Sequence, residues 1–195
     1  MLLLPYLKEG VSEAYVIMKN ILIVLTVIFS LNIYASDYVA KATDLIKSFE
    51  TFRETPYRDV NKMAIGWGFN DPTLVKRDKM SRDEADRILN GYVVSIGGYI
   101  DTQVKVPLTD NQKSALVVFI YNVGRGNFAS STLLKKLNNR EYTSVASEIK
   151  RWNKVKKTDA RGRIVKDKNG KVVYVAAPGL VKRRQAEANL WLSNK

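Results

Sequence analysis

The sequence predicts an α+β protein that is mainly α. In several segments apolar residues recur at steps of three and four, and Ser or Thr stands just before two of them, whereas strand-favouring residues are confined to two short stretches. The first pattern is typical of helices with one buried face, and the second is typical of small hairpins. With 195 residues, the chain can form one domain with a substantial core, or two lobes that share a cleft.

The first 35 residues are expected to be targeting material rather than part of the domain. Residues 21–31 carry no charge, Lys19 precedes them and Ala35 follows them, which is the order found in a secretory signal peptide. The uncharged run is shorter than the roughly 20 residues of a typical spanning helix. We predict a signal peptide at 18–35, with a membrane anchor as the alternative, and an upstream extension at 1–17. Either way the protein is exported, to the periplasm or the extracellular space.

The composition excludes some kinds of site and favours a polyanionic partner. The chain has neither cysteine nor histidine, so the usual zinc ligands and the usual base of a nucleophilic triad are missing. We therefore predict no metal and no cofactor. The net charge of +13 attracts polyanions over a long range. For an exported monomer these are an anionic wall or membrane surface, and nucleic acid is the less favoured partner.

The expected domain, 36–195, starts with a helix and a small sheet. Apolar residues at helical spacing predict the first helix over 39–49. A proline, an aromatic residue and two glycines then indicate a hairpin or three-stranded sheet at 55–69. The run Ser81-Arg82-Asp83-Glu84 has the pattern of a capping box and starts a helix through Ile96, whose end the pair Gly97-Gly98 weakens.

The remaining elements are mostly helical. A second capping box, Thr109-Asp110-Asn111-Gln112, starts an apolar and therefore buried central helix that Gly124 ends. Further helices are expected at 131–137, 143–152 and 180–192. Between the last two, Asn169-Gly170 favours a type I′ turn and predicts a basic two-stranded hairpin inserted at about 154–177.

Two acidic residues flank the start of the small sheet. Glu50 ends the first helical pattern and Asp59 lies on the glycine-punctuated segment that follows. Cleavage of a glycosidic bond needs such a pair, because one group protonates the leaving oxygen while an ionised group steers water or stabilises positive charge on the sugar. The two carboxyl groups are therefore a candidate sugar-cutting site.

Four ordered blocks of sequence resemble the phage-type lysozymes, the endolysins of glycoside hydrolase family 24. They cover about residues 40–192 and comprise Phe49–Asp59 with Ile65-Gly66-Trp67-Gly68, then Leu108–Gln112, then Phe119–Phe128 with Ser131-Thr132-Leu133-Leu134, and finally Pro178–Arg184 with Glu187. The resemblance implies a lysozyme-like fold with a small β-sheet lobe and a helical lobe. It also implies peptidoglycan as the substrate, cut at the β-1,4 bond between N-acetylmuramic acid and N-acetylglucosamine.

The same resemblance assigns roles to individual residues. It makes Glu50 the general acid and Asp59 the second carboxylate, with Arg53 supporting Glu50 or the sheet. Substrate-binding positions are implied at Tyr121, Asn122, Asn70 and Ser131. Two alternatives are a non-catalytic peptidoglycan-binding protein that keeps the cleft, and a lytic transglycosylase-like cleavage.

The chain departs from the family pattern where water would be held. Ala64 stands where the family has threonine, after a spacer one residue shorter, and Phe69 stands where it has histidine. Alanine cannot make the hydrogen bond of a threonine hydroxyl. Three interpretations stay open: Asp59 handles water with another partner, the sugar's own hydroxyl attacks, or activity is lost.

Each assignment also has a purely structural alternative. Glu50 can be a helix-end glutamate paired with a cation, and Asp59 a turn aspartate that accepts backbone hydrogen bonds. Tyr121 fits core packing as well as a sugar contact. Trp67 and Trp152 are platforms for a sugar ring or, more commonly for tryptophan, parts of the core. The basic run on the predicted hairpin grips a polyanion or is simply solvated.

Overall fold

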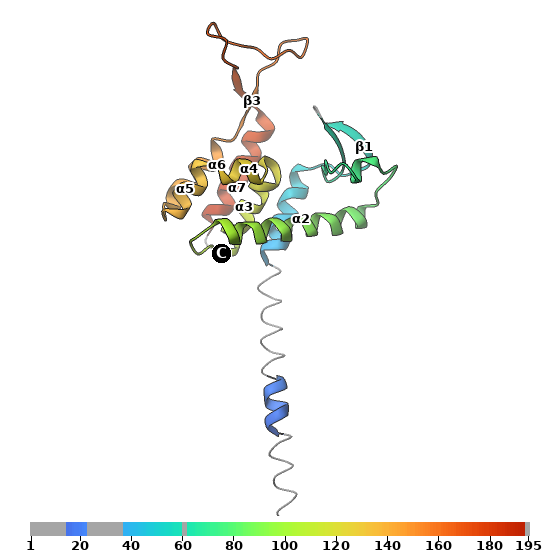
Figure 1. Ribbon diagram of the computed structural model, residues 1–195, viewed down its shortest axis with the longest axis vertical. Coiled ribbons are helices and arrows are strands. Elements are labelled where there is room, and N and C mark those ends of the chain that lie inside the picture. The colour runs from blue at the N-terminus through green and yellow to red at the C-terminus, as the bar shows by residue number, and fades with distance from the viewer. Residues whose placement is uncertain (1–14, 23–36, 60–61, 194–195) are drawn as a thin grey trace, which may run out of the picture. The chain divides into compact units, whose positions relative to one another are not determined.

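The computed structural model describes residues 15–22, 37–59 and 62–193 (Figure 1). Its contacts divide the chain into one unit over Met1–Asp37 and another over Tyr38–Lys195. In the first unit, residues 15–22 form a helix. Within the described parts, no helix is long and apolar enough to cross a membrane. Most of the expected extension at 1–17 and of the expected signal peptide at 18–35 lies outside the described residues.

The second unit confirms the predicted α+β, mainly α class. A helix over residues 37–49 leads to β1 (Arg53–Asp59), β2 (Lys62–Gly66) and the short 3₁₀ helix η1 (Leu74–Lys76). The helical part then follows as α2 (Arg82–Gln103), α3 (Asp110–Val123), α4 (Arg125–Ala129), α5 (Thr132–Asn138) and α6 (Tyr142–Lys150). The chain closes with β3 (Lys154–Lys156), β4 (Tyr174–Ala176) and α7 (Pro178–Leu192).

The long helix α2 connects a small sheet-bearing lobe to a helical lobe (Figure 1). Ser81 caps its start, since the side chain accepts a hydrogen bond from the Glu84 amide. The expected weakening at Gly97-Gly98 is wrong, because the helix continues to Gln103. A Cβ atom at Gly97 would lie 2.4 Å from the Tyr38 hydroxyl oxygen. Gly97 therefore lets the first helix pack closely against α2.

The central helix α3 organises the core, as its apolar run predicts. The capping box at Thr109 is complete, with Gln112 as the reciprocal partner, and Gly124 is the C-cap. Every residue from Ser114 to Ile120 is buried, and α3 packs against α2 and α7. Burial of this kind is the main source of folding free energy. The core therefore holds α7, at the end of the chain, against the middle of the chain.

The small lobe is an antiparallel pair of strands. Register places Tyr57 opposite Ala64 and Asp59 opposite Lys62, and the ladder is irregular between Arg53 and Tyr57. The sheet has two strands, β1 and β2, plus an isolated bridge. This places Asp59 at the far end of the strand that starts just after Glu50.

A basic arm, residues 154–176, projects from the helical lobe (Figure 1). Its stem is the antiparallel pair β3 and β4. Beyond the stem the chain makes two separate turns, bridged at Thr158↔Ile164 and at Lys166↔Val172. The expected type I′ turn is wrong: that turn needs positive φ at both central residues, and here Gly170 has φ 76° whereas Asn169 has no positive φ.

Candidate active site

Glu50 sits where the first helix ends. Its amide donates to the carbonyl of the fully buried Ile46 at 3.0 Å, so the last helical turn fixes the start of the side chain. The Glu50 side chain is 23% exposed. Gly68, with φ +86°, lies beneath it, and a Cβ there would come within 3.1 Å of Glu50 Oε2. Glycine is therefore required at this position both for its backbone conformation and for the space that the carboxylate occupies.

A pocket of about 480 Å³ contains both acidic residues. It is lined by Phe49, Glu50, Asp59, Gly68, Asn70, Tyr121, Asn122, Ala177, Gly179, Leu180 and Arg183. Five of the residues predicted for the site thus line one cavity, namely Glu50, Asp59, Asn70, Tyr121 and Asn122. The pocket includes parts of both lobes and the start of α7.

Arg183 is the site residue that the sequence-based interpretation missed. Its Nη2 donates a hydrogen bond to Glu50 Oε1 in an ion pair, and the guanidinium lies 5.1 Å from the centre of the Phe49 ring. The residue is buried on α7. A planar guanidinium that both pairs with a carboxylate and stacks on a ring holds that carboxylate in a defined orientation. The sequence signal was the basic stretch that ends the Pro178–Arg184 block.

Arg53 and Ser131 lie elsewhere. Arg53 is exposed on β1, with its guanidinium 5.9 Å from the Tyr57 ring centre, and within the described residues it makes no ion pair with Glu50. Ser131 is buried as the N-cap of α5, where it accepts from Leu134 N at 3.1 Å and donates to Phe128 O at 2.7 Å. Of the two expected positions of Arg53, at Glu50 or in the sheet, the structure has it on strand β1 opposite Gly66, while Arg183 contacts Glu50. Ser131 caps α5 and does not line this pocket.

Tyr121 joins the helical lobe to the small lobe. Its hydroxyl donates to the backbone carbonyl of Trp67 at 2.8 Å. Burial raises the pKa of Tyr121 far above its usual value, and the charge of Glu50 adds to the effect, so the phenol stays neutral and keeps this donor role. Tyr121 packs against the core and also lines the pocket, which makes it both a packing residue and a lining residue.

The two tryptophans discussed as sugar platforms pack in the core instead. Trp67 is 5% exposed, and its indole N–H donates to Asp86 at 2.7 Å. Trp152 packs edge-on against Phe119, with ring centres 5.6 Å apart. Neither residue lines the pocket that holds Glu50.

Asn122 is oriented from behind by the buried side chains of Arg184 and Glu187. Arg184 donates to Asn122 Oδ1 at 3.0 Å and to Glu187 Oε1 at 2.7 Å. Arg184 and Glu187 are 1% and 0% exposed. Burial raises the pKa of Glu187 to about 8, although Arg184 and Arg183 oppose the shift, and burial lowers the pKa of Arg184. The hydrogen bond from Arg184 therefore orients the side-chain amide of Asn122, which lines the pocket.

The two departures from the family pattern lie in the core of the small lobe. Ala64 is 2% exposed and Phe69 is 3% exposed, and neither lines the pocket. The Phe69 ring stacks on Tyr92 with centres 5.5 Å apart. The neighbouring Asn70 does line the pocket and makes no hydrogen bond within the described part of the chain. Asn70 is therefore, within the described residues, a side-chain amide without a hydrogen-bond partner in the pocket that Asp59 also lines.

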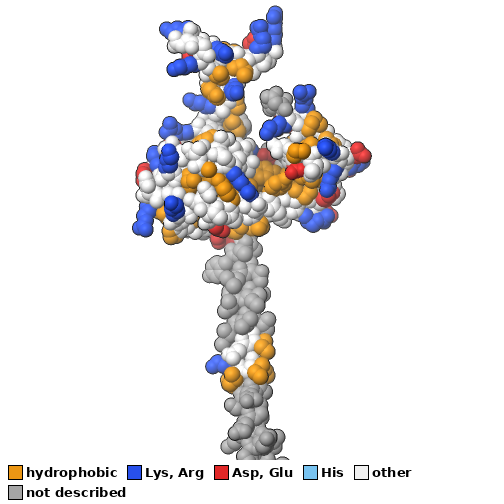
Figure 2. All heavy atoms as spheres, in the orientation of Figure 1, with side chains coloured by type: hydrophobic (Ala, Val, Ile, Leu, Met, Phe, Trp, Pro, Cys, Tyr) orange, Lys and Arg blue, Asp and Glu red, His pale blue; other side chains and the backbone are white. Residues whose placement is uncertain are grey.

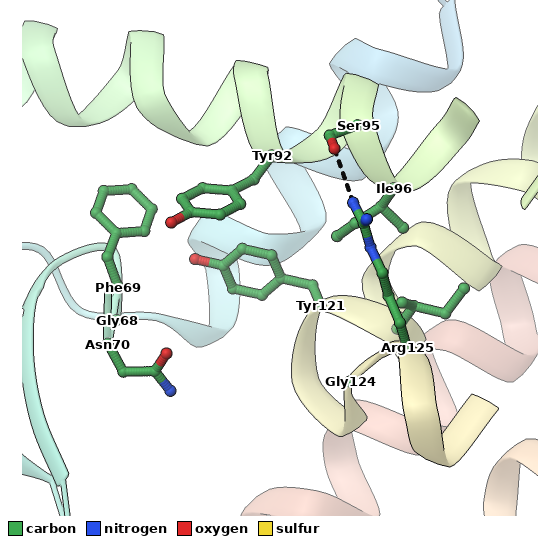
Figure 3. A pocket seen from close by; sticks show the side chains of 10 residues that line it. Gly68, Phe69, Asn70, Tyr92, Ser95, Ile96, Tyr121, Gly124 and Arg125 are labelled. Atoms are coloured by element: carbon green, nitrogen blue, oxygen red, sulfur yellow. Dashed lines mark hydrogen bonds between the residues drawn. The ribbon is translucent and has the colours of Figure 1, made fainter. Parts of the chain in front are cut away.

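The pocket continues into two further cavities. The first, about 380 Å³, lies between the small lobe and α2, α3 and α4 and shares Gly68, Asn70 and Tyr121 with the pocket. In Figure 3, Phe69 and Asn70 face Tyr92 and Tyr121 across this space, and Arg125 bonds to Ser95 at its far side. The second further cavity adjoins the first one, with which it shares the lining residues Tyr92 and Ser95. Because each cavity shares lining residues with the next, the three cavities together form a groove.

Among the described residues there is no group of three or more acidic side chains that could hold a metal ion. The polar side chains that line the pocket are those of Glu50, Asp59, Asn70, Tyr121, Asn122 and Arg183.

Comparisons with known proteins agree with this geometry. The family model for phage lysozyme matches residues 47–187. The endolysin of Acyrthosiphon pisum secondary endosymbiont phage 1 is 34% identical over 154 residues, which are 78% of this chain and 96% of that protein. The SAR-endolysin of Escherichia phage Mu is 33% identical over 146 residues, 73% of each chain. The chain spans only 52% and 53% of the endolysins of Bacillus phages B103 and PZA.

Among solved structures, the muramidase domain of SpmX from Asticaccaulis excentricus superposes with a TM-score of 0.64. Its sequence is 26% identical, and the match covers 78% of this chain and 95% of that domain. The fold, the matched region and the sequence identity all point to the same family. The chain therefore belongs to the phage lysozyme family and is a lysozyme-type glycosidase.

Proposed function

We propose that this protein is a peptidoglycan-degrading muramidase that cuts the β-1,4 bond between N-acetylmuramic acid and N-acetylglucosamine. Glu50 is the general acid and Asp59 the second carboxylate. The observation that carries the proposal is that the two carboxyl groups line one pocket of about 480 Å³, and that this pocket opens into a groove of adjoining cavities.

Glu50 suits the role of proton donor to the leaving oxygen. It is partly buried between Phe49, Gly68 and Arg183, so its orientation is fixed before substrate enters. Glu50, which is ion-paired with Arg183 in the structure, takes up a proton before the reaction, and it gives this proton to the bridging oxygen as the bond from the sugar carbon to that oxygen breaks. The sugar carbon gains positive charge, which the Asp59 carboxylate stabilises or quenches by directing a water molecule.

Asn70 is the partner that we propose for Asp59 in holding this water. The usual threonine is replaced by Ala64, which is buried and cannot hydrogen-bond through its side chain. Of the two asparagines in the pocket, Asn122 has its oxygen occupied by Arg184, whereas Asn70 has both amide atoms free within the described residues. Water attacks the sugar carbon, its proton passes to Asp59, and the product carries a reducing end.

Mass spectrometry of muropeptides released from purified sacculi tests the bond and the reaction type together. We expect fragments with reducing N-acetylmuramic acid ends. Products lighter by one water would instead indicate attack by the sugar's own hydroxyl, and an absence of released fragments would favour a non-catalytic wall-binding protein.

The role of Asp59 has its own test. Asp59→Asn should lower the rate of release by about 100-fold or more, the usual size of an acid–base contribution, while binding to sacculi persists. Asp78→Asn is the matched control, because Asp78 is exposed and lines none of the three cavities. Equal rates for the two variants would remove Asp59 from the mechanism.

We further propose that the protein reaches the periplasm and that residues 18–35 direct its export, either as a cleaved signal or as a membrane tether. The uncharged run at 21–31 and the similarity to SAR-endolysins support this. In the periplasm, the net charge of +13 attracts the protein to an anionic wall or membrane surface. Cell fractionation with N-terminal sequencing tests export: we expect the protein in the periplasmic or membrane fraction, and recovery from the cytoplasm alone would contradict it.

A further inference from the structure

The basic arm is built from an eight-residue sequence repeat. Residues 158–165 read Thr-Asp-Ala-Arg-Gly-Arg-Ile-Val and residues 166–173 read Lys-Asp-Lys-Asn-Gly-Lys-Val-Val. Asp and Gly occupy the same places in both copies, a basic residue follows each Gly, and an apolar pair closes each copy. The regular spacing predicts that the two copies form the same turn.

The structure shows the same turn twice. Asp159 Oδ1 accepts from the amides of Arg161 and Arg163, both at 2.9 Å. In the second copy Asp167 Oδ1 accepts from the amides two and four residues ahead, at 2.8 and 3.0 Å. Gly162 and Gly170 have φ +75° and +76°. Each acidic side chain of the arm is therefore used to shape its own turn.

The two turns are held apart by a closed ring of three backbone hydrogen bonds. Lys157 N donates to Val173 O at 2.8 Å, Val173 N donates to Val165 O at 3.0 Å, and Val165 N donates to Lys157 O at 2.9 Å. The stem and the two turns meet at these three residues. Because a lone two-stranded hairpin is only marginally stable, this ring explains how an arm without any buried residue keeps a defined, two-pronged shape.

The arm carries a concentrated positive charge that its own acids do not neutralise. Within the described residues, one ion pair on the arm joins Arg163 to Asp159 at 2.8 Å. All of its basic residues are exposed, and they are Lys154, Lys156, Lys157, Arg161, Arg163, Lys166, Lys168 and Lys171. Figure 2 shows Lys and Arg side chains at the ends of both prongs. The arm is therefore suited to bind carboxylate or phosphate groups.

The arm is rooted on the wall of the active-site pocket. Strand β4 ends at Ala176, and the next residue, Ala177, lines the pocket and donates its amide to Asn153 O at 2.9 Å. Gly179 and Leu180 line the same wall. The foot of the arm therefore adjoins one wall of the pocket, where it can meet groups carried by a chain bound against that wall.

We infer that the arm binds the carboxylates of the acidic peptides that hang from the glycan strand held in the groove. This inference rests on the proposed muramidase function and adds a second contact to the same substrate. The position of the arm favours a ligand continuous with the one in the pocket, and its charge favours an acidic one. A glycan strand with acidic peptides meets both conditions.

An anionic membrane surface fits the arm less well. A segment that inserts into a membrane surface buries an apolar face in the lipid. Here the tips are Arg161-Gly162 and Asn169-Gly170. Of the exposed apolar residues of the arm, Val155, Tyr174 and Val175 belong to the stem strands and a single one, Ile164, lies in a prong. The cations are also spread over both diverging prongs rather than over one flat face.

Binding of the full-length protein to two forms of glycan tests the inference. Each protein carries Glu50→Gln so that the ligand stays intact. The ligands are sacculi with their peptides and the same glycan after amidase removal of the peptides. The arm variant has four exposed cations changed to glutamine, at Arg161, Lys166, Lys168 and Lys171, and the control has four exposed cations outside the arm changed likewise, at Arg87, Lys105, Lys135 and Lys150.

We expect the parent protein to bind peptide-bearing glycan more tightly than peptide-free glycan. In the arm variant the ratio of these two affinities should fall about tenfold. Four exposed ion pairs at the low end of their usual strength would have this effect. The control should keep the preference. An arm variant that keeps it as well would overturn the inference, as would a loss equal on both ligands.

Two further measurements separate the alternatives. If the arm variant loses sedimentation with vesicles of phosphatidylcholine and phosphatidylglycerol but keeps its preference for peptide-bearing sacculi, the ligand is membrane and the inference is wrong. If the protein with Glu50 intact does not cleave the peptide-free glycan, the muramidase proposal fails, whatever the arm variant shows. Thermal melting of both variants checks that neither set of substitutions unfolds the domain.

Discussion

Arg183 donates a hydrogen bond to the Glu50 carboxylate across 133 positions of sequence. The contact joins the start of α7 to the end of the first helix, and α7 is itself held by packing against α3. The general acid proposed here is therefore oriented by the last helix of the domain. The local sequence around Glu50 supplies the carboxyl group, and the tertiary fold supplies its orientation.

Replacing Arg183 by lysine should slow catalysis more than it weakens binding. Lysine keeps the charge but lacks the planar fork that pairs with Glu50 while stacking on Phe49. Because a small displacement of a catalytic group can cost up to about 100-fold, we expect muropeptide release to fall between about tenfold and 100-fold, with sacculus binding within about twofold of the parent. Lys182→Gln, at an exposed neighbour, should behave like the parent. A lysine variant with the parent's rate would show that orientation by Arg183 does not matter.

Replacing Ser131 by alanine should affect stability and leave sugar cleavage alone. The hydroxyl caps α5 and donates to a carbonyl in a buried setting, so its loss should lower the free energy of unfolding by about 1–2 kcal/mol. Urea denaturation measures this, with the exposed Ser130→Ala as the control. If stability were unchanged while sacculus binding dropped, Ser131 would be a substrate ligand after all.

The sequence predicts the parts of this protein that depend on local signals. The caps at Ser81 and Thr109, the buried run of α3 and the break at Gly124 all follow from neighbouring residues, and the structure confirms them. The spacing of Glu50 and Asp59 and the glycines beside them made the pair a candidate site, and the family resemblance gave the two residues their expected roles. Both lie in one pocket.

Contacts between residues far apart in the sequence could not be predicted from such local signals. Nothing near Arg53 or Arg183 says which of the two meets Glu50, because the answer depends on how α7 packs. Gly97 looks like a helix breaker from sequence, and only the approach of Tyr38 explains it as a packing position. The arm is different, because the repeated spacing of Asp159 and Gly162, and of Asp167 and Gly170, is visible in the sequence and predicts two turns. The pair Asn169-Gly170 taken alone predicts only one.

Glu187 should make stability depend on pH. Its pKa is raised from 4.5 to about 8 by burial, so between these values the folded state holds a proton that the unfolded state has released. The stabilisation is complete below pH 4.5 and is lost as the pH rises through about 8. Relative to Glu187→Gln, the parent should lose up to about 1.4 kcal/mol of unfolding free energy per pH unit in this window.

Urea denaturation at several pH values across this window measures the difference. Glu141→Gln, at an exposed position, corrects for general effects of removing one acid. Parallel pH profiles for the parent and Glu187→Gln would mean that Glu187 is ionised in the folded protein at all these pH values.

The most direct test is the release of muropeptides by Glu50→Gln, measured beside its binding to sacculi. Glutamine has nearly the shape of glutamate but has no proton to give to the leaving oxygen. We predict that release falls by about 100-fold or more, that binding persists, and that Glu54→Gln, on the exposed strand nearby, matches the parent. Release by Glu50→Gln at close to the parent's rate would show that Glu50 is not the general acid.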